Sequence, residues 1–150
     1  MNCLFCDFVS RKRKQHVDGL PFIPVNKTKH TLSFLSIDFP VRENAHLLII
    51  PKNHFAYIED IPKPVLNDLI SHTALAAKII KKSYGGCNVW VNNGKSAGQY
   101  IPHIHVHLIS RDRSDKIKIM RWKRKNISEK QFKDLSLFLQ EQFQQQKKIN

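Results

Sequence analysis

The stretch His103-Ile104-His105-Val106-His107-Leu108-Ile109 guides the interpretation of the whole chain. Histidine alternates in it with apolar residues, and residues two apart in a strand point to the same face. The pattern predicts a strand over residues 103–110 in which three imidazoles form a row on one face. Successive Cα atoms of that row should be roughly 6.5–7 Å apart, and the apolar residues between them should pack into the core.

The remaining pattern predicts an α+β protein. Strand signals precede the first helix, and each ends at a turn residue or a proline. Apolar residues at helical spacing then predict two helices, the first ended by Gly85-Gly86 and the second begun by a capping box at Ser128. The predicted strands cover residues 22–25, 31–37, 46–50 and 88–92, and the predicted helices cover 64–84 and 128–145.

This order of elements predicts an antiparallel sheet with one long helix packed on it and a C-terminal helix, instead of alternating parallel units. The length fits a single domain over residues 1–150. We expect its core at about residues 3–111, with a basic segment at 111–125 and the C-terminal helix as extensions.

The charge of the chain is unusual, because 25 Lys and Arg against 12 Asp and Glu give a formal net charge of +13. The basic residues gather in two clusters, at residues 11–14 and at residues 111–125. One interpretation is a strongly solvated surface. The others are a field that attracts phosphorylated ligands, or a nucleic-acid surface in which Trp122 stacks on bases.

The sequence contains three cysteines, of which Cys3 and Cys6 form a Cys-x-x-Cys pair. An odd number of cysteines favours a reducing compartment and a metal or redox role over a disulfide framework. We find neither an apolar run of membrane-spanning length nor the layout of a signal peptide, and we therefore expect a cytoplasmic protein.

Two kinds of chemistry fit a row of three imidazoles. One is a zinc site with three histidine ligands, and the other is a nucleophilic imidazole with its neighbours. A neutral imidazole can attack phosphorus when one ring nitrogen is held as N–H and the other is free. Zinc on all three rings would remove that nucleophile, so the two interpretations exclude each other.

At these residues the chain resembles the histidine triad (HIT) family, whose signature is His-x-His-x-His followed by two apolar residues. The resemblance extends over about residues 3–111. It includes Asp38, Asn92, the opening Cys3-x-x-Cys6, the block from Ala45 to His54 and the turn Ala97-Gly98-Gln99. The combined match is far more specific than any one of its parts.

The resemblance implies a nucleotide hydrolase or transferase with a HIT-like fold. His105 would attack the α-phosphorus of a nucleotide and form a nucleotidyl-histidine intermediate that water hydrolyses. His107 would lie beside the same phosphate, and Asp38 would bind the ribose hydroxyls. The rest of the implied site consists of His46, Asn92 and Gln99 around the phosphate, and of Phe22 with Leu35 or Ile37 at the base.

The resemblance also implies a structural zinc ion and a homodimer. Four ligands, Cys3, Cys6, His54 and His103, would form a closed Cys₂His₂ site, and the chemistry itself would need no metal. The sheets of two copies would join across a two-fold interface. Two positions depart from the family pattern: Ala45 replaces a common Gly, and Tyr100 replaces a small hydroxyl residue, which leaves the leaving-group preference open.

The expected substrate is a dinucleoside polyphosphate or a nucleoside phosphoramidate. The alternative is a nucleotide- or nucleic-acid-binding module in which the basic clusters make the main contact. Removal of nucleotides from adenylated nucleic acid would combine both hypotheses.

Overall fold

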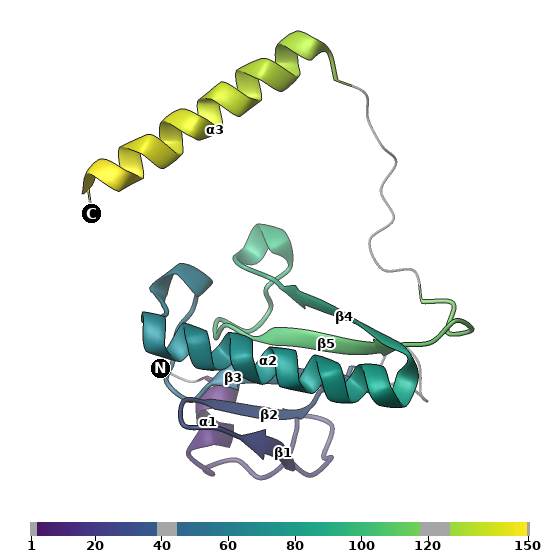
Figure 1. Cartoon of the computed structure of the whole chain (residues 1–150). Helices are drawn as coiled ribbons and strands as arrows, with labels where there is room; N and C mark the ends of the chain where they lie inside the picture. Colours follow the sequence, from purple (N-terminus) through teal and green to yellow (C-terminus); the bar gives the residue numbers. More distant parts are fainter. Residues whose placement is uncertain (1–2, 39–44, 118–126, 150) are drawn as a thin grey trace. The chain divides into compact units, whose positions relative to one another are not determined.

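The structure, a computed structural model, describes residues 3–38, 45–117 and 127–149 (Figure 1). By its internal contacts the chain divides into two units, residues 1–117 and residues 118–150, and each is described by itself. The division falls inside the predicted basic extension. The expectation of one domain over residues 1–150 stays a prediction.

The first unit contains a five-stranded antiparallel sheet in the order β1-β2-β3-β5-β4. This confirms the predicted α+β class. The strands are β1 Pro24–Lys27, β2 Thr31–Leu35, β3 His46–Pro51, β4 Gly86–Val91 and β5 Val106–Arg111. Helix α1 covers Leu4–Val9, helix α2 covers Lys63–Tyr84, and two short 3₁₀ turns cover Ile58–Asp60 and Lys95–Ala97.

Local signals set the ends of α2. Pro64 lies in the first turn, where the N–H groups of a helix have no carbonyl partner within it, so the missing N–H of proline costs nothing there. The helix ends at Gly85, which has a φ of 94°. A residue with a side chain rarely adopts that conformation, whereas glycine does so at little cost. The Gly85 N–H closes the last turn by donating to the Lys81 carbonyl.

The two faces of the sheet pack against different partners. On one face, α2 lies across the strands, and alternate residues of β3 and β5, such as Ile49 and Leu108, pack beneath it. On the other face, Leu48 and Ile50 pack with Phe5 and Phe8 of α1. The apolar spacers of the histidine stretch are therefore core residues, as predicted: Ile104 and Leu108 are 0% exposed.

The histidine stretch is not one continuous strand, which corrects the prediction. Strand β5 begins at Val106, opposite Ile49 of β3, so His103 and His105 precede it. Strand β3 ends at Pro51, which has no N–H to extend the ladder. Instead, Ile104 donates to the carbonyl of Phe55 at 2.7 Å. The strand ladder therefore begins only at Val106, although Ile104, Val106 and Leu108 still pack into the same core.

The second unit contains helix α3, Glu129–Ile149. The predicted capping box is present: the Gln131 N–H donates to the Ser128 hydroxyl at 3.2 Å, and the Ser128 N–H donates to Gln131 Oε1 at 2.9 Å. The apolar residues of α3 are exposed within this unit; Phe132 and Phe143, for example, are 64% and 70% exposed. Among the described residues, no helix combines the length and the apolar character needed to cross a membrane.

Candidate active site and metal centre

Four side chains meet where α1 reaches the sheet. The Sγ atom of Cys3 lies 3.5 Å from Nδ1 of His103, and Sγ of Cys6 lies 3.4 Å from Nδ1 of His54 and 3.6 Å from Nδ1 of His103. All four potential ligand atoms lie within 4.8 Å of one another. The structure thus brings together the four residues of the predicted metal site.

The chemistry of this cluster fits zinc. Tetrahedral zinc with sulfur at about 2.3 Å and nitrogen at about 2.0–2.1 Å separates the two by about 3.6 Å. Nε2–H of His103 donates to the Pro51 carbonyl at 2.9 Å, and this leaves Nδ1 as the free lone pair facing the cysteines. Burial lowers the pKa of His103 to about 4 and raises the pKa of Cys6 to about 11. The imidazole is thus neutral, as a ligand must be, and a cation would stabilise the thiolates.

A chain of hydrogen bonds fixes the tautomers of the other histidines. Nδ1–H of His46 donates to the Asp38 carbonyl, so Nε2 of His46 is an acceptor when the ring is neutral. Nδ1 of His107 lies 3.0 Å from that Nε2 and must therefore carry the proton. The second nitrogen of His107, Nε2, is then a bare lone pair. It is the buried side-chain nitrogen without a partner among the described residues.

The same reasoning applies to His105. Its Nδ1 lies 2.8 Å from the His103 carbonyl, which can only accept, so Nδ1 carries the proton and Nε2 is unprotonated. The rings of His105 and His107 lie 4.7 Å apart between centroids. Two neutral imidazoles therefore present free lone pairs within one small region.

Burial keeps these rings neutral. It lowers the pKa of His105 and of His46, and it lowers the pKa of His107 to about 3 with a contribution from the neighbouring His105 and His46. Near neutral pH the site therefore contains nucleophilic nitrogens that are not masked by protons. An anion bound beside His107 would favour protonation of its free nitrogen, because opposite charge and a new hydrogen bond both stabilise the imidazolium.

These histidines open into a cavity of about 480 Å³. Asp38 and Ile37, two of the predicted nucleotide-binding residues, line it together with His46, His105 and His107. Its apolar wall includes residues that the sequence analysis did not single out: Phe5 from α1, Val17 from the following loop, Phe34 from β2, and Ile101. The volume lies within the range of small-molecule sites.

Phe22 and Leu35 do not line this cavity, in contrast to the expectation for the base pocket. The loop before β1 folds back so that Phe22 donates its N–H to the Lys14 carbonyl at 2.9 Å and stacks on Phe8 at 4.1 Å between centroids. Phe22 thereby reaches a different cavity. Leu35 is 45% exposed and also lies outside the histidine cavity.

Asn92 and Gln99 lie in the turn between β4 and β5 and do not line the histidine cavity. The buried Gln99 amide accepts from the Gly94 N–H at 2.8 Å and donates to the carbonyls of Ala56 at 2.8 Å and Ile101 at 3.3 Å. Its bonds therefore hold the turn that leads to the histidines. Asn92 donates to the Gly98 carbonyl at 3.4 Å. Direct contact of either residue with a nucleotide stays a prediction.

The second basic cluster begins with an arginine that is used within the fold. Arg111 forms a two-pronged ion pair with Asp115, 2.6 and 2.9 Å long, and this pairing holds the Asp115 pKa far below its usual range. Trp122 and the basic residues at 118–125 lie outside the described residues.

His72 illustrates a histidine with a structural use. It is 3% exposed, and its ring lies 2.8 Å from the Thr31 hydroxyl and 3.2 Å from the Asn26 amide. The sequence analysis placed no chemistry on it, and its polar atoms are satisfied inside the fold.

Comparison with known proteins agrees with this geometry. Residues 23–114 match the model of the HIT domain. The chain is 35% identical over 114 residues to the adenosine 5'-monophosphoramidase HNT1 of Candida albicans, covering 72% of this chain and 69% of that protein.

Two solved structures are similar to it. A histidine triad nucleotide-binding protein from Candida albicans superposes with a TM-score of 0.77 at 28% identity, covering 96% of this chain and 99% of that one. A Zn-bound histidine triad family protein from Mycobacterium smegmatis gives 0.68 at 28% identity, covering 83% and 85%.

Fold and site together define a small α+β protein with a row of neutral histidines beside a Cys₂His₂ cluster. The chain belongs to the HIT family.

Proposed function

We propose that this chain is a hydrolase or transferase that acts at the α-phosphorus of a nucleotide through a covalent bond to His105. The observation that carries the proposal is the unprotonated Nε2 of His105, which lies beside His107 in a cavity of nucleotide size. A nucleoside phosphoramidate is the first substrate to test, because the relative from Candida albicans is named as an adenosine 5'-monophosphoramidase. A dinucleoside polyphosphate is the second.

In the first step, Nε2 of His105 attacks phosphorus, and the bond from phosphorus to the leaving nitrogen or oxygen breaks. The leaving group takes a proton from Nε2 of His107, which the bound phosphate has helped to protonate. In the second step, water attacks the same phosphorus and gives its proton to His107. The bond to His105 breaks, the nucleoside monophosphate leaves, and His105 is neutral again.

The neighbouring groups position this pair. His46 accepts from Nδ1–H of His107 and so keeps the second nitrogen of that ring directed at the phosphate. The carboxylate of Asp38, on the cavity wall, would accept hydrogen bonds from ribose hydroxyls and so favour nucleotides over simple phosphates.

Cys3, Cys6, His54 and His103 would hold a structural zinc ion. A closed four-ligand site leaves no position for substrate, so the ion would stabilise the N-terminus against the sheet and take no part in the reaction. Cysteines that hold a metal ion instead of forming a disulfide suit a reducing compartment such as the cytoplasm.

A homodimer completes the proposal. Within the described residues, β4 is an edge strand that pairs only with β5, and its Val89 is 46% exposed. An open edge of this kind can continue a sheet into a second copy. Light scattering of the purified chain would measure the mass of the particle in solution. A mass of twice 17.5 kDa supports the dimer, and a mass of 17.5 kDa, that of one chain, contradicts it.

The test of the mechanism is His105→Asn, assayed with adenosine 5'-phosphoramidate. Asn keeps a polar side chain of similar size but cannot form the intermediate, so we expect kcat to fall by at least about a thousandfold. Lys82→Gln, an exposed change on α2, is the matched control. Acid quenching during turnover should trap a nucleoside monophosphate on the wild-type chain and not on His105→Asn. Undiminished turnover of the variant would exclude the mechanism.

A further inference from the structure

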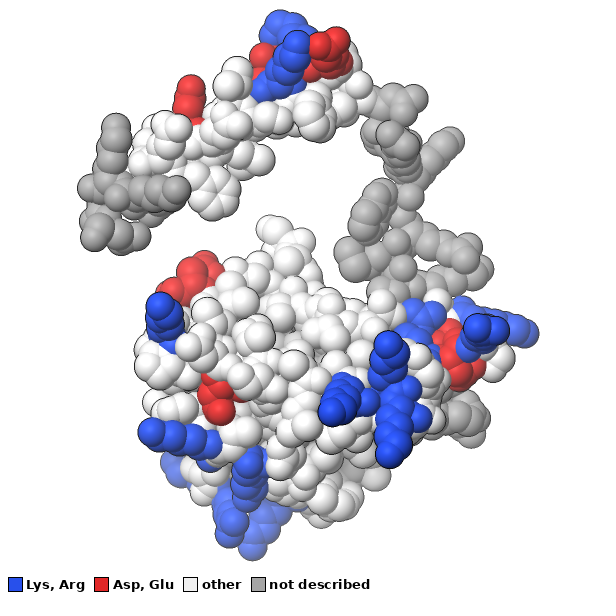
Figure 2. Space-filling model, in the orientation of Figure 1, with Lys and Arg blue, Asp and Glu red and all other residues white. Residues whose placement is uncertain are grey.

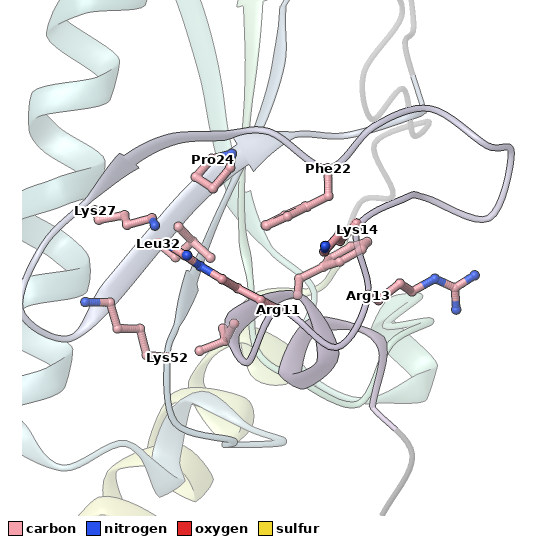
Figure 3. A pocket seen from close by; sticks show the side chains of 10 residues that line it. Arg11, Arg13, Lys14, Phe22, Pro24, Lys27, Leu32 and Lys52 are labelled. Atoms are coloured by element: carbon pink, nitrogen blue, oxygen red, sulfur yellow. The ribbon is translucent and has the colours of Figure 1, made fainter.

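A second cavity, of about 730 Å³, lies on the α1 side of the sheet and shares no lining residue with the histidine cavity. It is bounded by α1, the loop at residues 10–22, β1, β2 and the residue after β3. Half of its ten lining residues are basic, and none is acidic. The basic residues are Arg11, Arg13, Lys14, Lys27 and Lys52 (Figure 3).

Within the described residues, no carboxylate forms an ion pair with the basic side chains of this cavity. Each ion pair recorded among the described residues lies elsewhere, at Arg111–Asp115 and within α3. Lys52 donates to the carbonyls of Thr28 and Lys29, and Arg13 donates to the Gln15 carbonyl; both contacts satisfy donors without cancelling charge. Cations without an ion-pair partner around a concavity attract a multivalent anion.

Figure 3 shows how three of these side chains lie. Arg11 extends from the loop after α1 toward Lys27 of β1, and Lys14 lies beside the ring of Phe22. Arg11, Lys14 and Lys27 are exposed and so are accessible to a ligand from solvent. Lysine and arginine side chains also gather near α1 and β1 on the face drawn in Figure 2.

The floor of the cavity is apolar. It consists of Phe8, Val9, Phe22, Pro24 and Leu32. Phe22 stacks on Phe8, which is 1% exposed, and packs edge-on against Phe34 at 5.1 Å between centroids. A rigid aromatic surface beneath a ring of cations suits a ligand that has both an anionic and a planar part.

The loop that carries Arg11 and Lys14 is ordered by its own bonds. Gln15 pairs with Pro21 in an isolated bridge, and His16 donates its N–H to the Leu20 carbonyl at 2.7 Å. The Phe22 N–H closes the loop onto Lys14. The main chain that carries Arg11 and Lys14 is therefore held in place before any ligand binds, which reduces the entropy lost on binding.

We propose that this cavity is a binding site for an organic polyphosphate of the nucleoside polyphosphate class, separate from the histidine site. The phosphates contact Arg11, Lys14 and Lys27, and the base lies over Phe22, Pro24 and Leu32. The volume is that of a small-molecule pocket, whereas a nucleic-acid strand requires a continuous track of cations and stacking rings. The two sites share a wall: Phe8 belongs to one cavity and contacts His16 and Phe34 of the other.

The test is binding of ATP and of inorganic tripolyphosphate at low salt, in a His105→Asn background that prevents turnover. Backbone ¹H–¹⁵N NMR spectra locate the bound probe, and calorimetry gives the affinity. We expect shifts at residues 8–27 and at Lys52 with both probes. ATP should bind at least as tightly as tripolyphosphate, because the floor adds apolar contact. Shifts confined to residues 36–48 and 100–107 would refute the second site.

The decisive variant is the triple change Arg11→Gln, Lys14→Gln and Lys27→Gln. Its matched control, Lys78→Gln, Lys81→Gln and Lys82→Gln, removes three charges from α2 on the other face of the sheet. The first should weaken tripolyphosphate binding by about tenfold or more, and the control by less than about twofold. Equal losses in both would show a general charge effect and overturn the proposal.

Two more measurements distinguish this cavity from the histidine site and from a nucleic-acid surface. The triple variant with His105 intact should hydrolyse adenosine 5'-phosphoramidate at the wild-type rate, so failure of the hydrolase proposal and failure of this one remain distinguishable. A single-stranded oligonucleotide should not displace ATP. If the oligonucleotide displaces bound ATP at a lower concentration than unlabelled ATP does, the cavity belongs to a nucleic-acid surface, and the small-molecule site is refuted.

Discussion

The histidine cavity and the basic cavity, both in the sheet unit, present opposite kinds of side chain to a phosphate. The histidine cavity is lined by buried rings whose pKa values are lowered, so the rings are neutral. Hydrogen bonds determine which nitrogen of each ring carries the proton. The second cavity is lined by basic side chains, most of them exposed, over an apolar floor. Charge alone can hold an anion, whereas attack on phosphorus requires a lone pair that no proton occupies. This difference agrees with our proposal of one site for chemistry and another for binding.

The largest difference between the two cavities should come from removing the hydrogen bond that fixes the tautomer of His107. His46→Leu removes the acceptor that keeps the proton on Nδ1 of His107, and we expect kcat for adenosine 5'-phosphoramidate to fall by about 10–100-fold. His46→Gln keeps an acceptor oxygen and should restore part of the loss, which a purely steric role would not predict. Tripolyphosphate binding in the other cavity should stay at the wild-type level. An unchanged kcat in His46→Leu would contradict the assigned tautomers.

The second largest difference should be in the response of the two cavities to salt. Raising the NaCl concentration from about 0.05 to 0.5 M shortens the screening length from roughly 14 Å to 4 Å. Binding of tripolyphosphate to the exposed cations should weaken by about tenfold, because each contact must displace counterions. The kcat of the buried histidine site should change by less than about twofold. Calorimetry and a steady-state assay at matched salt would measure both, and parallel losses would contradict the separation.

Metal removal should affect stability more than chemistry. We expect about one zinc ion per chain by elemental analysis, and a strong chelator should lower Tm by roughly 5–10 °C, because binding to the folded state alone stabilises that state. Cys6→Ser should bind less zinc and respond weakly to the chelator. Ser10→Ala, an exposed change just after α1, is the control. Complete loss of activity at a temperature where the metal-free chain is still folded would instead indicate a catalytic metal.

The smallest expected effect is that of mild acid on turnover. Burial lowers the pKa of His105, His46 and His107, so protonation of the free enzyme should occur below the ordinary histidine value near 6.5. We predict that the pH profile of kcat/KM has no bend near 6.5 between pH 7.5 and 6, because neither His105 nor His107 of the free enzyme changes its protonation there. A titration step centred near 6.5 would contradict the neutral, buried rings.

The same pKa values set the direction of the effect on stability. In the unfolded chain these histidines take up protons below about pH 6.5, whereas in the folded chain His107 does so only near 3. Their contribution to the free energy of unfolding is therefore complete above 6.5 and is lost as the pH falls toward 3. Thermal melts between pH 7 and 4 should show Tm falling, and His107→Asn should reduce the fall.

Local signals in the sequence predicted much of the fold. Gly85 and the capping box at Ser128 mark the ends of helices, and Pro51 ends β3, where the structure has them. These features depend on a few adjacent residues. The metal-site residues were brought together as expected because the resemblance supplied contacts that lie about one hundred positions apart in the chain, between Cys3 and His103.

Features that depend on distant packing were not predictable. Helix α1 has only six residues, too few for a helical repeat of apolar residues to be recognised in the sequence. It is held by burial of Phe5 and Phe8 against the sheet. The position of Phe22 depends on its stacking against Phe8 and on the bridge between Gln15 and Pro21. For the same reason, the basic cluster at residues 11–14 could not be assigned to a cavity, because Lys27 and Lys52 join it only in three dimensions.

His103 links the two halves of the site through three separate bonds. Its ring faces the cysteines on one side and the Pro51 carbonyl on the other, and its own main-chain carbonyl orients the ring of His105. Contact with the N-terminal cysteines and orientation of the proposed nucleophile thus both depend on one amino acid. Loss of the two thiols would leave the Pro51 carbonyl as the remaining hydrogen-bond partner of this ring, and any shift of His103 would reach the ring of His105 through the main chain.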